Sequence, residues 1–142
     1  MIYLGSDHAG YELKEYIRKY LSGKGERVED LGAKDNQPSD YPEFAKVVAQ
    51  KISQNPEDKG ILFCRSGQGM AMAANRFKGV RAAVVWNAGV ARESRNDNNS
   101  NILSLPAGYL SKEEASKIVD VWLATPLSTE ERHHKRIKEI DQ

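Results

Sequence analysis

The chain has 142 residues, of which 39% are hydrophobic and 29% are charged, and its formal net charge is +1. This length predicts one domain over residues 1–142, and the charge balance argues against a nucleic-acid partner or an anionic membrane. No apolar run approaches the ~20 residues of a membrane span, and no basic-then-apolar leader begins the chain. A single cysteine cannot form an internal disulfide, so we expect a cytoplasmic protein.

Short apolar segments alternate with amphipathic helical patterns along the chain. The continuous apolar stretch GILFC is typical of the centre of a parallel sheet. Strands are expected at residues 2–6, 27–32, 60–64, 80–86 and 101–106. Helices are expected at residues 13–21, 42–52, 67–76, 88–96 and 111–122, with one more after residue 128.

Three of the predicted helices begin with capping signals. Asp40 is a candidate N-cap, and the SKEE and STEE sequences that begin at Ser111 and Ser128 are candidate capping boxes. The helix after STEE is basic, through residues 132–136. We expect Ser128 to open this last helix.

Strands that alternate with helices five times predict an α/β fold with a parallel sheet and right-handed crossovers. In such sheets ligands bind at the carboxyl ends of the strands. The segments of interest therefore follow each strand directly, at residues 6–8, 64–69, 86–87 and 106–108.

The segment after the third predicted strand has the composition of a loop that binds an anion on backbone N–H groups. It lacks the G-x-x-x-x-G-K-[ST] sequence of a Walker loop, and Met72 stands at the third small position of a dinucleotide fingerprint. A cysteine phosphatase would need an arginine where Met70 stands. One cysteine and three histidines also lack the spacing of zinc ligands.

Two interpretations of Cys64 remain. The thiol can act as a base beside an anion pocket, because thiols at such loops have a lowered pKa and backbone N–H groups can hold a developing oxyanion. Alternatively, Cys64 is a buried small hydrophobic residue that precedes a turn. The loop composition gives the two interpretations about equal weight.

Five segments occur in the order GSDHAGYELK, SDYPEFA, ILFCRSGQGMAMAANRFKGVRAA, SRNDNNSNILSL and ERHHKRI. With them, the whole chain resembles the ribose-5-phosphate isomerase B and galactose-6-phosphate isomerase family. The resemblance implies a three-layer Rossmann-like domain with a five-stranded parallel sheet. It also implies no metal or organic cofactor, and a homodimer or dimer of dimers in which the C-terminal helix reaches a partner subunit.

The same resemblance implies an aldose–ketose isomerase that acts through an enediolate, with ribose 5-phosphate and ribulose 5-phosphate as the first expectation. It assigns proton transfer to Cys64, with Ser66 and Asp97 as the other catalytic positions. The substrate-binding positions that it implies are Asp7, His8, Tyr41, Arg65, Gly67, Gln68, Gly69, Asn98, Arg132 and Arg136. The last two arginines lie four residues apart, on one helical face suited to a phosphate.

Two positions depart from the family pattern. Asp97 stands where the family commonly has the histidine that opens the sugar ring, and Gly108 stands where it commonly has a phosphate-binding arginine. We weigh three explanations: Asp97 acts as the base while His8, His133 or His134 donates the proton; the substrate needs no ring opening; or the protein is a catalytically impaired sugar-phosphate-binding protein. Arg65 is a candidate replacement for the charge that is missing at Gly108.

Overall fold

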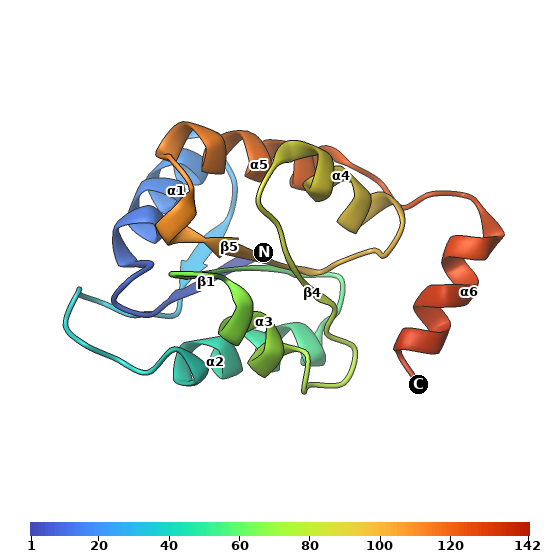
Figure 1. Ribbon diagram of the computed structural model, residues 1–142, viewed down its shortest axis with the longest axis horizontal. Coiled ribbons are helices and arrows are strands. Elements are labelled where there is room, and N and C mark those ends of the chain that lie inside the picture. The colour runs from blue at the N-terminus through green and yellow to red at the C-terminus, as the bar shows by residue number, and fades with distance from the viewer.

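The structure, a computed structural model, describes residues 1–142. Its centre is a parallel sheet in the order β2-β1-β3-β5-β4 (Figure 1). The strands are β1 (Ile2–Ser6), β2 (Val28–Asp30), β3 (Lys59–Cys64), β4 (Ala82–Val84) and β5 (Ile102–Pro106). The predicted five-stranded parallel sheet is confirmed, although the edge strands β2 and β4 are both shorter than the sequence pattern indicated.

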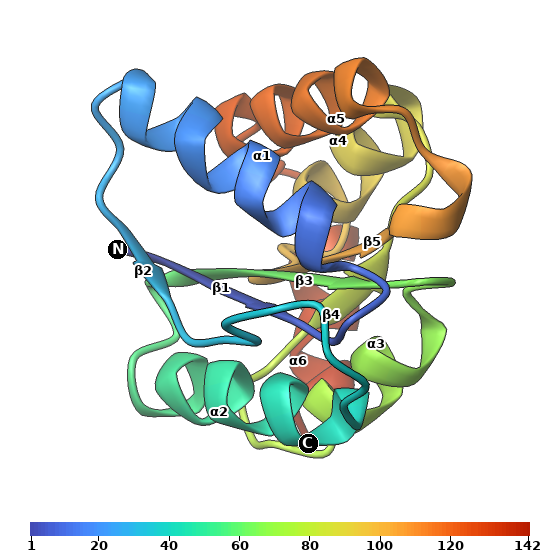
Figure 2. The ribbon, with the colours of Figure 1, turned by 90° about the vertical axis from the view of Figure 1, so that its left-hand side faces the viewer.

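Helices cover both faces of the sheet, which gives the expected three layers (Figures 1 and 2). One layer holds α1 (Tyr11–Gly23), α4 (Ala88–Asn96) and α5 (Lys112–Ala124), and the other holds α2 (Tyr41–Gln54) and α3 (Gln68–Ala74). A cluster of 15 buried hydrophobic residues lies under the first layer and one of 10 lies under the second. Because both faces of β3 are covered, its residues are apolar without alternation.

The direction of the chain across the sheet reverses between β1 and β3. From β1 the chain moves outward to β2, whereas after β3 it continues on the other side to β4 and β5. The two central strands pair from Ile2 with Lys59 to Ser6 with Phe63. The crevice outside their carboxyl ends is where ligands bind in open α/β sheets.

The helix α6 (Glu131–Ile140) stands apart from both helical layers (Figure 1). The segment that precedes α6 contacts the end of α4, where the Ser128 N–H donates to the Asn96 carbonyl at 3.0 Å. The C-terminal end of α6 is tied to the body by an ion pair of 2.9 Å between Arg81 and Asp141. Most of the helix surface is left without cover from the same chain.

The capping predictions have different outcomes. Ser111 and Glu114 form the predicted capping box at α5. The prediction at Ser128 is wrong: its hydroxyl accepts from the Glu130 N–H, and the helix begins only at residue 131. Asp40 does precede α2, but its side chain makes no capping hydrogen bond. The short 3-10 helix over Ala107–Tyr109 was not anticipated.

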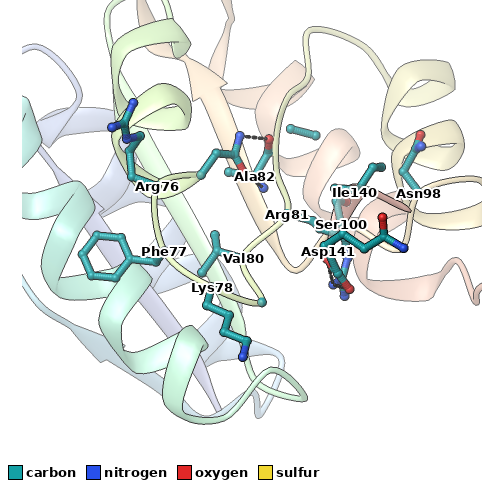
Figure 3. Close-up of a pocket in the computed structure, with 14 residues that line it drawn as sticks. Arg76, Phe77, Lys78, Val80, Arg81, Ala82, Asn98, Ser100, Ile140 and Asp141 are labelled. Carbon is teal, nitrogen blue, oxygen red and sulfur yellow. Dashed lines mark hydrogen bonds and ion pairs between the residues drawn. The ribbon is translucent and has the colours of Figure 1, made fainter. Parts of the chain in front are cut away.

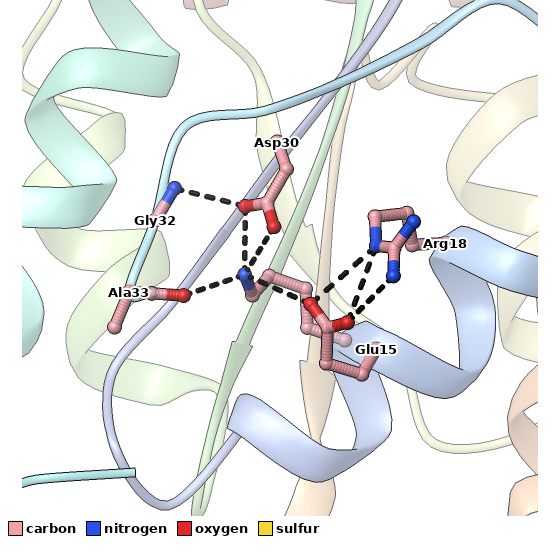
Figure 4. Close-up of polar contacts among 6 residues, drawn as sticks. Glu15, Arg18, Asp30, Gly32 and Ala33 are labelled. Atoms are coloured by element: carbon pink, nitrogen blue, oxygen red, sulfur yellow. Dashed lines mark hydrogen bonds and ion pairs between the residues drawn. The ribbon is translucent and has the colours of Figure 1, made fainter. Parts of the chain in front are cut away.

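A buried ammonium group fixes the segment that connects β2 to α2. The Lys14 Nζ donates to both carboxylate oxygens of Asp30, at 2.7 and 2.8 Å, and to the Ala33 carbonyl at 2.7 Å (Figure 4). Asp30 also accepts from the Gly32 N–H at 2.9 Å. This network holds the start of the loop that continues to Ser39 and Tyr41, and both of these residues lie at the crevice described below.

Candidate active site

The residues that follow β1 line one side of the crevice. Asp7 is buried, and its carboxylate accepts from the Gly10 N–H at 3.0 Å. His8 is exposed and makes two hydrogen bonds with Ser39. The backbone N–H of His8 donates to the Ser39 hydroxyl at 3.1 Å, and the ring Nδ1 of His8 accepts from the backbone N–H of Ser39 at 3.2 Å. Because Nδ1 is an acceptor, the neutral His8 ring carries its proton on Nε2.

Cys64 ends β3 on the other side of the crevice, with only 5% of its surface exposed. Burial raises the pKa of the Cys64 thiol, and the charge of Asp7 raises it further. The backbone N–H groups of Met70, Gly67 and Ser66 point toward the sulfur and oppose this rise in pKa. The thiol is therefore buried as in the structural interpretation, and it also has three donors arranged around it that would stabilise negative charge.

Two positions of the loop around the thiol require glycine. Gly67 adopts a φ of 74°, in the left-handed region, and its carbonyl accepts from the buried Ser104 hydroxyl at 2.6 Å. Gly69 lies against the ring of Tyr41, and a Cβ at Gly69 would lie 2.8 Å from the Tyr41 hydroxyl oxygen. The first turn of α2 therefore covers the loop that surrounds Cys64.

The outer part of the loop faces solvent. The Ser66 hydroxyl accepts from the Gln68 N–H at 3.3 Å. Arg65 is exposed, and its guanidinium lies 5.8 Å from the centre of the Tyr109 ring. Beside it lies a depression of about 540 Å³ with a mainly apolar lining, formed by Ser66, Gln68, Val84, Trp86, Pro106 and Tyr109.

Two other predicted site residues, Asp97 and Asn98, lie at the amino ends of the strands, whereas Cys64 lies at a carboxyl end. Asp97 and Asn98 follow α4 and precede the amino end of β5, whereas Cys64 pairs with Pro106 at the carboxyl end of that strand. The five residues of β5 span about 15 Å. One chain alone therefore does not bring Asp97 or Asn98 to the thiol.

The two predicted phosphate ligands on α6 also lie away from the thiol. Arg132 is exposed and pairs with Glu130 at 2.7 Å, and Arg136 is exposed. Neither contacts the crevice residues of its own chain. The predicted site thus divides into a crevice set, at the ends of β1 and β3, and an α6 set formed by Asp97, Asn98, Arg132 and Arg136.

One residue of the basic run over residues 132–136 is buried. Only 6% of His133 is exposed. Its Nε2 lies 3.7 Å from Asp97 Oδ1, and its Nδ1 lies 3.7 Å from Glu130 Oε2. The signal was the spacing to Ile137, which is also buried and lies four residues on, on the same helix face.

A cavity of about 620 Å³ lies away from the thiol, between residues 75–83 and the C-terminal end of α6, with Asn98 and Ser100 beside that end (Figure 3). The Arg81–Asp141 ion pair lies in its wall. Asn98 is the one predicted site residue in its lining.

The sequence from residue 2 to residue 140 matches the family described as Ribose/Galactose Isomerase. The chain belongs to this family. It is 40% identical to the probable ribose-5-phosphate isomerase B of Mycoplasma pneumoniae, over 98% of this chain and 91% of that protein. It is 37% identical to ribose-5-phosphate isomerase B of Escherichia coli, over 98% of this chain and 93% of that protein.

Solved structures of the ribose/galactose isomerase family share the fold described above. The ribose 5-phosphate isomerase of Thermotoga maritima superposes with a TM-score of 0.95 at 48% identity, and covers 99% of this chain and 96% of its own. The ribose-5-phosphate isomerase B of Mycoplasma genitalium, solved with bound ribulose-5-phosphate, has a TM-score of 0.95 at 40% identity, with 99% and 93% covered. The fold of this chain is thus that of sugar-phosphate isomerases over nearly its whole length.

Proposed function

We propose that the protein is an aldose–ketose isomerase that interconverts ribose 5-phosphate and ribulose 5-phosphate. The observation that carries the proposal is the position of the Cys64 thiol. It lies at the carboxyl ends of β1 and β3, where the chain reverses direction across the sheet, with the N–H groups of Ser66, Gly67 and Met70 near it. Support comes from the Mycoplasma genitalium relative, which was solved with ribulose-5-phosphate bound. The polar side chains of Asp7 and His8, directly after β1, suit the hydroxyl groups of such a molecule.

Cys64 would act as the base of the isomerisation. Its thiolate removes the proton from C2 of the open aldose, and the electrons of that bond form the enediolate while charge moves to the carbonyl oxygen on C1. The proton of the O2 hydroxyl then moves to O1, and the same thiol returns its proton to C1 while the C2 carbonyl forms. Loop N–H groups and the Ser66 hydroxyl are near enough to stabilise charge on the sulfur and on the adjoining oxygens, and Met70 offers no competing base.

Asp7 and His8 would bind the sugar hydroxyls from the wall opposite the loop, and Tyr41 would bind them from its place against Gly69. Gln68 would lie at the rim, with Gly67 and Gly69 supplying backbone. His8 suits this role because Ser39 fixes its tautomer and leaves the Nε2 proton free to donate. No metal ion and no organic cofactor enter this scheme, because the base and the charge-stabilising groups are all supplied by the chain.

The phosphate would be bound by cations that come from two chains. Arg132 and Arg136 are exposed on a helix that stands apart from its own body, and the cavity beside that helix is open. We infer that a second copy packs there, so that its crevice meets Asp97, Asn98 and both arginines of this copy. The assembly would be a homodimer or a dimer of dimers. Arg65 would supply a further cation from the crevice side.

All strands lie in one sheet, which supports a single domain over residues 1–142. No helix is long and apolar enough to cross a bilayer. We propose a cytoplasmic enzyme without nucleic-acid or membrane partners, as the single cysteine and the near-neutral charge favour.

A second candidate function is favoured by Asp97 and Gly108, which replace a histidine and an arginine of the family pattern: a protein that binds a sugar phosphate without turnover. Proton exchange separates the two candidates. Incubation of ribulose 5-phosphate with the protein in deuterated water should place deuterium at C1, and Cys64→Ala should abolish this exchange while the substrate still protects the protein against thermal unfolding. Binding without exchange in the native protein would establish the second candidate instead.

A further inference from the structure

Ribose 5-phosphate exists mainly as a closed furanose, so an isomerase that uses it gains from opening the ring. Opening needs a proton for the ring oxygen O4 and an acceptor for the proton of the O1 hydroxyl. A lone aspartate accepts a proton at neutral pH but does not readily donate one, whereas an imidazole does both. The inference below rests on the proposed function and concerns the source of that proton.

Of the three histidines in the chain, two are poorly suited to supply it. The Nδ1 of His8 accepts from the Ser39 N–H, so the ring cannot become an imidazolium without losing that contact. The exposed His134 makes its contact with the Ser128 carbonyl, at 2.7 Å from Nε2. Neither ring has a carboxylate oxygen within 4.0 Å.

His133 is the histidine that meets carboxylates on both sides. Its Nε2 faces Asp97 and its Nδ1 faces Glu130, each at 3.7 Å. The Nδ1 is buried and has no hydrogen-bond partner. Each ring nitrogen of His133 therefore has a carboxylate oxygen beside it.

Asp97 connects this buried ring to the surface. The side chain of Asp97 is 40% exposed, whereas that of His133 is 8% exposed. The Asn96 amide donates to Asp97 Oδ1 at 2.7 Å and holds the carboxylate in place. Asp97 directly follows α4 and His133 lies in the first turn of α6, so the two side chains meet where the end of one helix lies beside the start of the other.

We propose that Asp97 opens the sugar ring with a proton that His133 holds in reserve. The imidazolium passes a proton to the carboxylate, and the resulting carboxyl donates it to O4 while the C1–O4 bond breaks and its electron pair goes to O4. The carboxylate then removes the O1 proton, and the O1–H electrons complete the C1 carbonyl. The pair ends with the proton count with which it began. Asp97 is the catalytic residue, and His133 is a positioning residue that acts through it.

The test compares a cyclic and an acyclic substrate on the same protein. Ribulose 5-phosphate has no furanose form because its O5 is blocked, so deuterium exchange at its C1 does not need ring opening. His133→Gln should lower turnover of ribose 5-phosphate at least about tenfold while exchange on ribulose 5-phosphate stays within about twofold of the native rate. His134→Gln, at the exposed neighbouring position, should leave both rates and their ratio unchanged.

Asp97→Asn provides a second variant in case His133→Gln does not fold, because the Asp97 side chain is partly exposed. It should produce the same selective loss on the cyclic substrate. A parallel loss of both rates, or a loss of neither, in the folded variants would overturn the role of this pair. Native protein that shows no exchange would instead overturn the proposed function, so the two failures are distinguishable.

Discussion

The side chain of Arg65 lies across Gly108, where a Cβ added to the glycine would lie 2.9 Å from Arg65 Cγ. The backbones of the two residues are also joined, because the Gly108 N–H donates to the Arg65 carbonyl at 2.9 Å. The missing side chain at residue 108 is what leaves this space to Arg65. A cation is therefore present at this rim although the residue at position 108 carries none.

Arg65→Ala should raise the KM for ribose 5-phosphate about 10- to 100-fold, because a hydrogen bond between charged groups contributes about 1.5–3 kcal/mol. The kcat should change less, since the guanidinium would bind the phosphate in the ground state and in the transition state alike. Steady-state kinetics check this, with Arg92→Ala on the exposed face of α4 as the control.

Gly108→Val gives an independent view of the same contact. The added side chain must displace Arg65, so KM should rise in this variant although no charge is lost. In the Arg65→Ala background the same substitution should add little, because the side chain that it displaces is gone. An equal rise in KM on Gly108→Val in both backgrounds would show that the substitution does not act by displacing the Arg65 side chain.

The Cys64 thiol provides a pH prediction. Burial and the nearby Asp7 raise its pKa above the ordinary thiol value, so the neutral thiol predominates at neutral pH and the thiolate forms as the pH rises. The rate of proton exchange should therefore increase with pH into the alkaline range and fall as the pH is lowered, and the rate of alkylation by iodoacetamide should follow the same curve. An exchange rate that is flat from pH 7 to 10 would contradict Cys64 as the base.

The buried ammonium of Lys14 provides a stability prediction. Lys14→Met should lower the free energy of unfolding by about 2 kcal/mol, because it leaves the Asp30 carboxylate and the Ala33 carbonyl without their shared donor. The loss of unfolding free energy should be smaller than for a fully buried ion pair, because the Asp30 side chain is 26% exposed. Urea denaturation checks this.

The neighbouring surface ion pair is the control for Lys14. Arg18 contacts Glu15 at 2.7 Å, but the Arg18 side chain is 36% exposed. Arg18→Gln should change the free energy of unfolding by no more than about 0.5 kcal/mol. Similar losses of unfolding free energy in both variants would show that the Lys14 network stabilises the fold no more than an exposed ion pair does.

The sequence predicted the strands and most helices well because apolar periodicity is a local property. The start of the last helix was harder to predict. Ser128 and Glu131 have the spacing of a capping box, but the Ser128 N–H donates a hydrogen bond to the Asn96 carbonyl, which is far away in sequence. His133 shows the same limit. A histidine within a basic run is ordinarily solvated, and its burial follows only from the packing of α6 beside Asp97.

The crevice set was predictable because each residue directly follows a strand of a parallel sheet, and such positions converge. The division from the α6 set was not predictable from spacing alone. Asp97 follows a helix and precedes a strand, which places it at the amino ends of the strands, whereas Cys64 lies at their carboxyl ends. The contact of Arg65 with Gly108 joins two separate loops, and no pattern within either loop encodes it.

The division of the site leads to a prediction on mixed assemblies. If each site takes Cys64 from one copy and Arg136 from another, Cys64→Ala and Arg136→Ala should each lose most activity alone. Equal amounts of the two variants, unfolded and refolded together, should regain about a quarter of the native activity, because about half of the dimers are mixed and each of these has one intact site. Mixing Cys64→Ala with Asp7→Asn, both in the crevice set, is the matched control and should regain none. Restoration by the control pair, or none by the first pair, would contradict a site shared between copies.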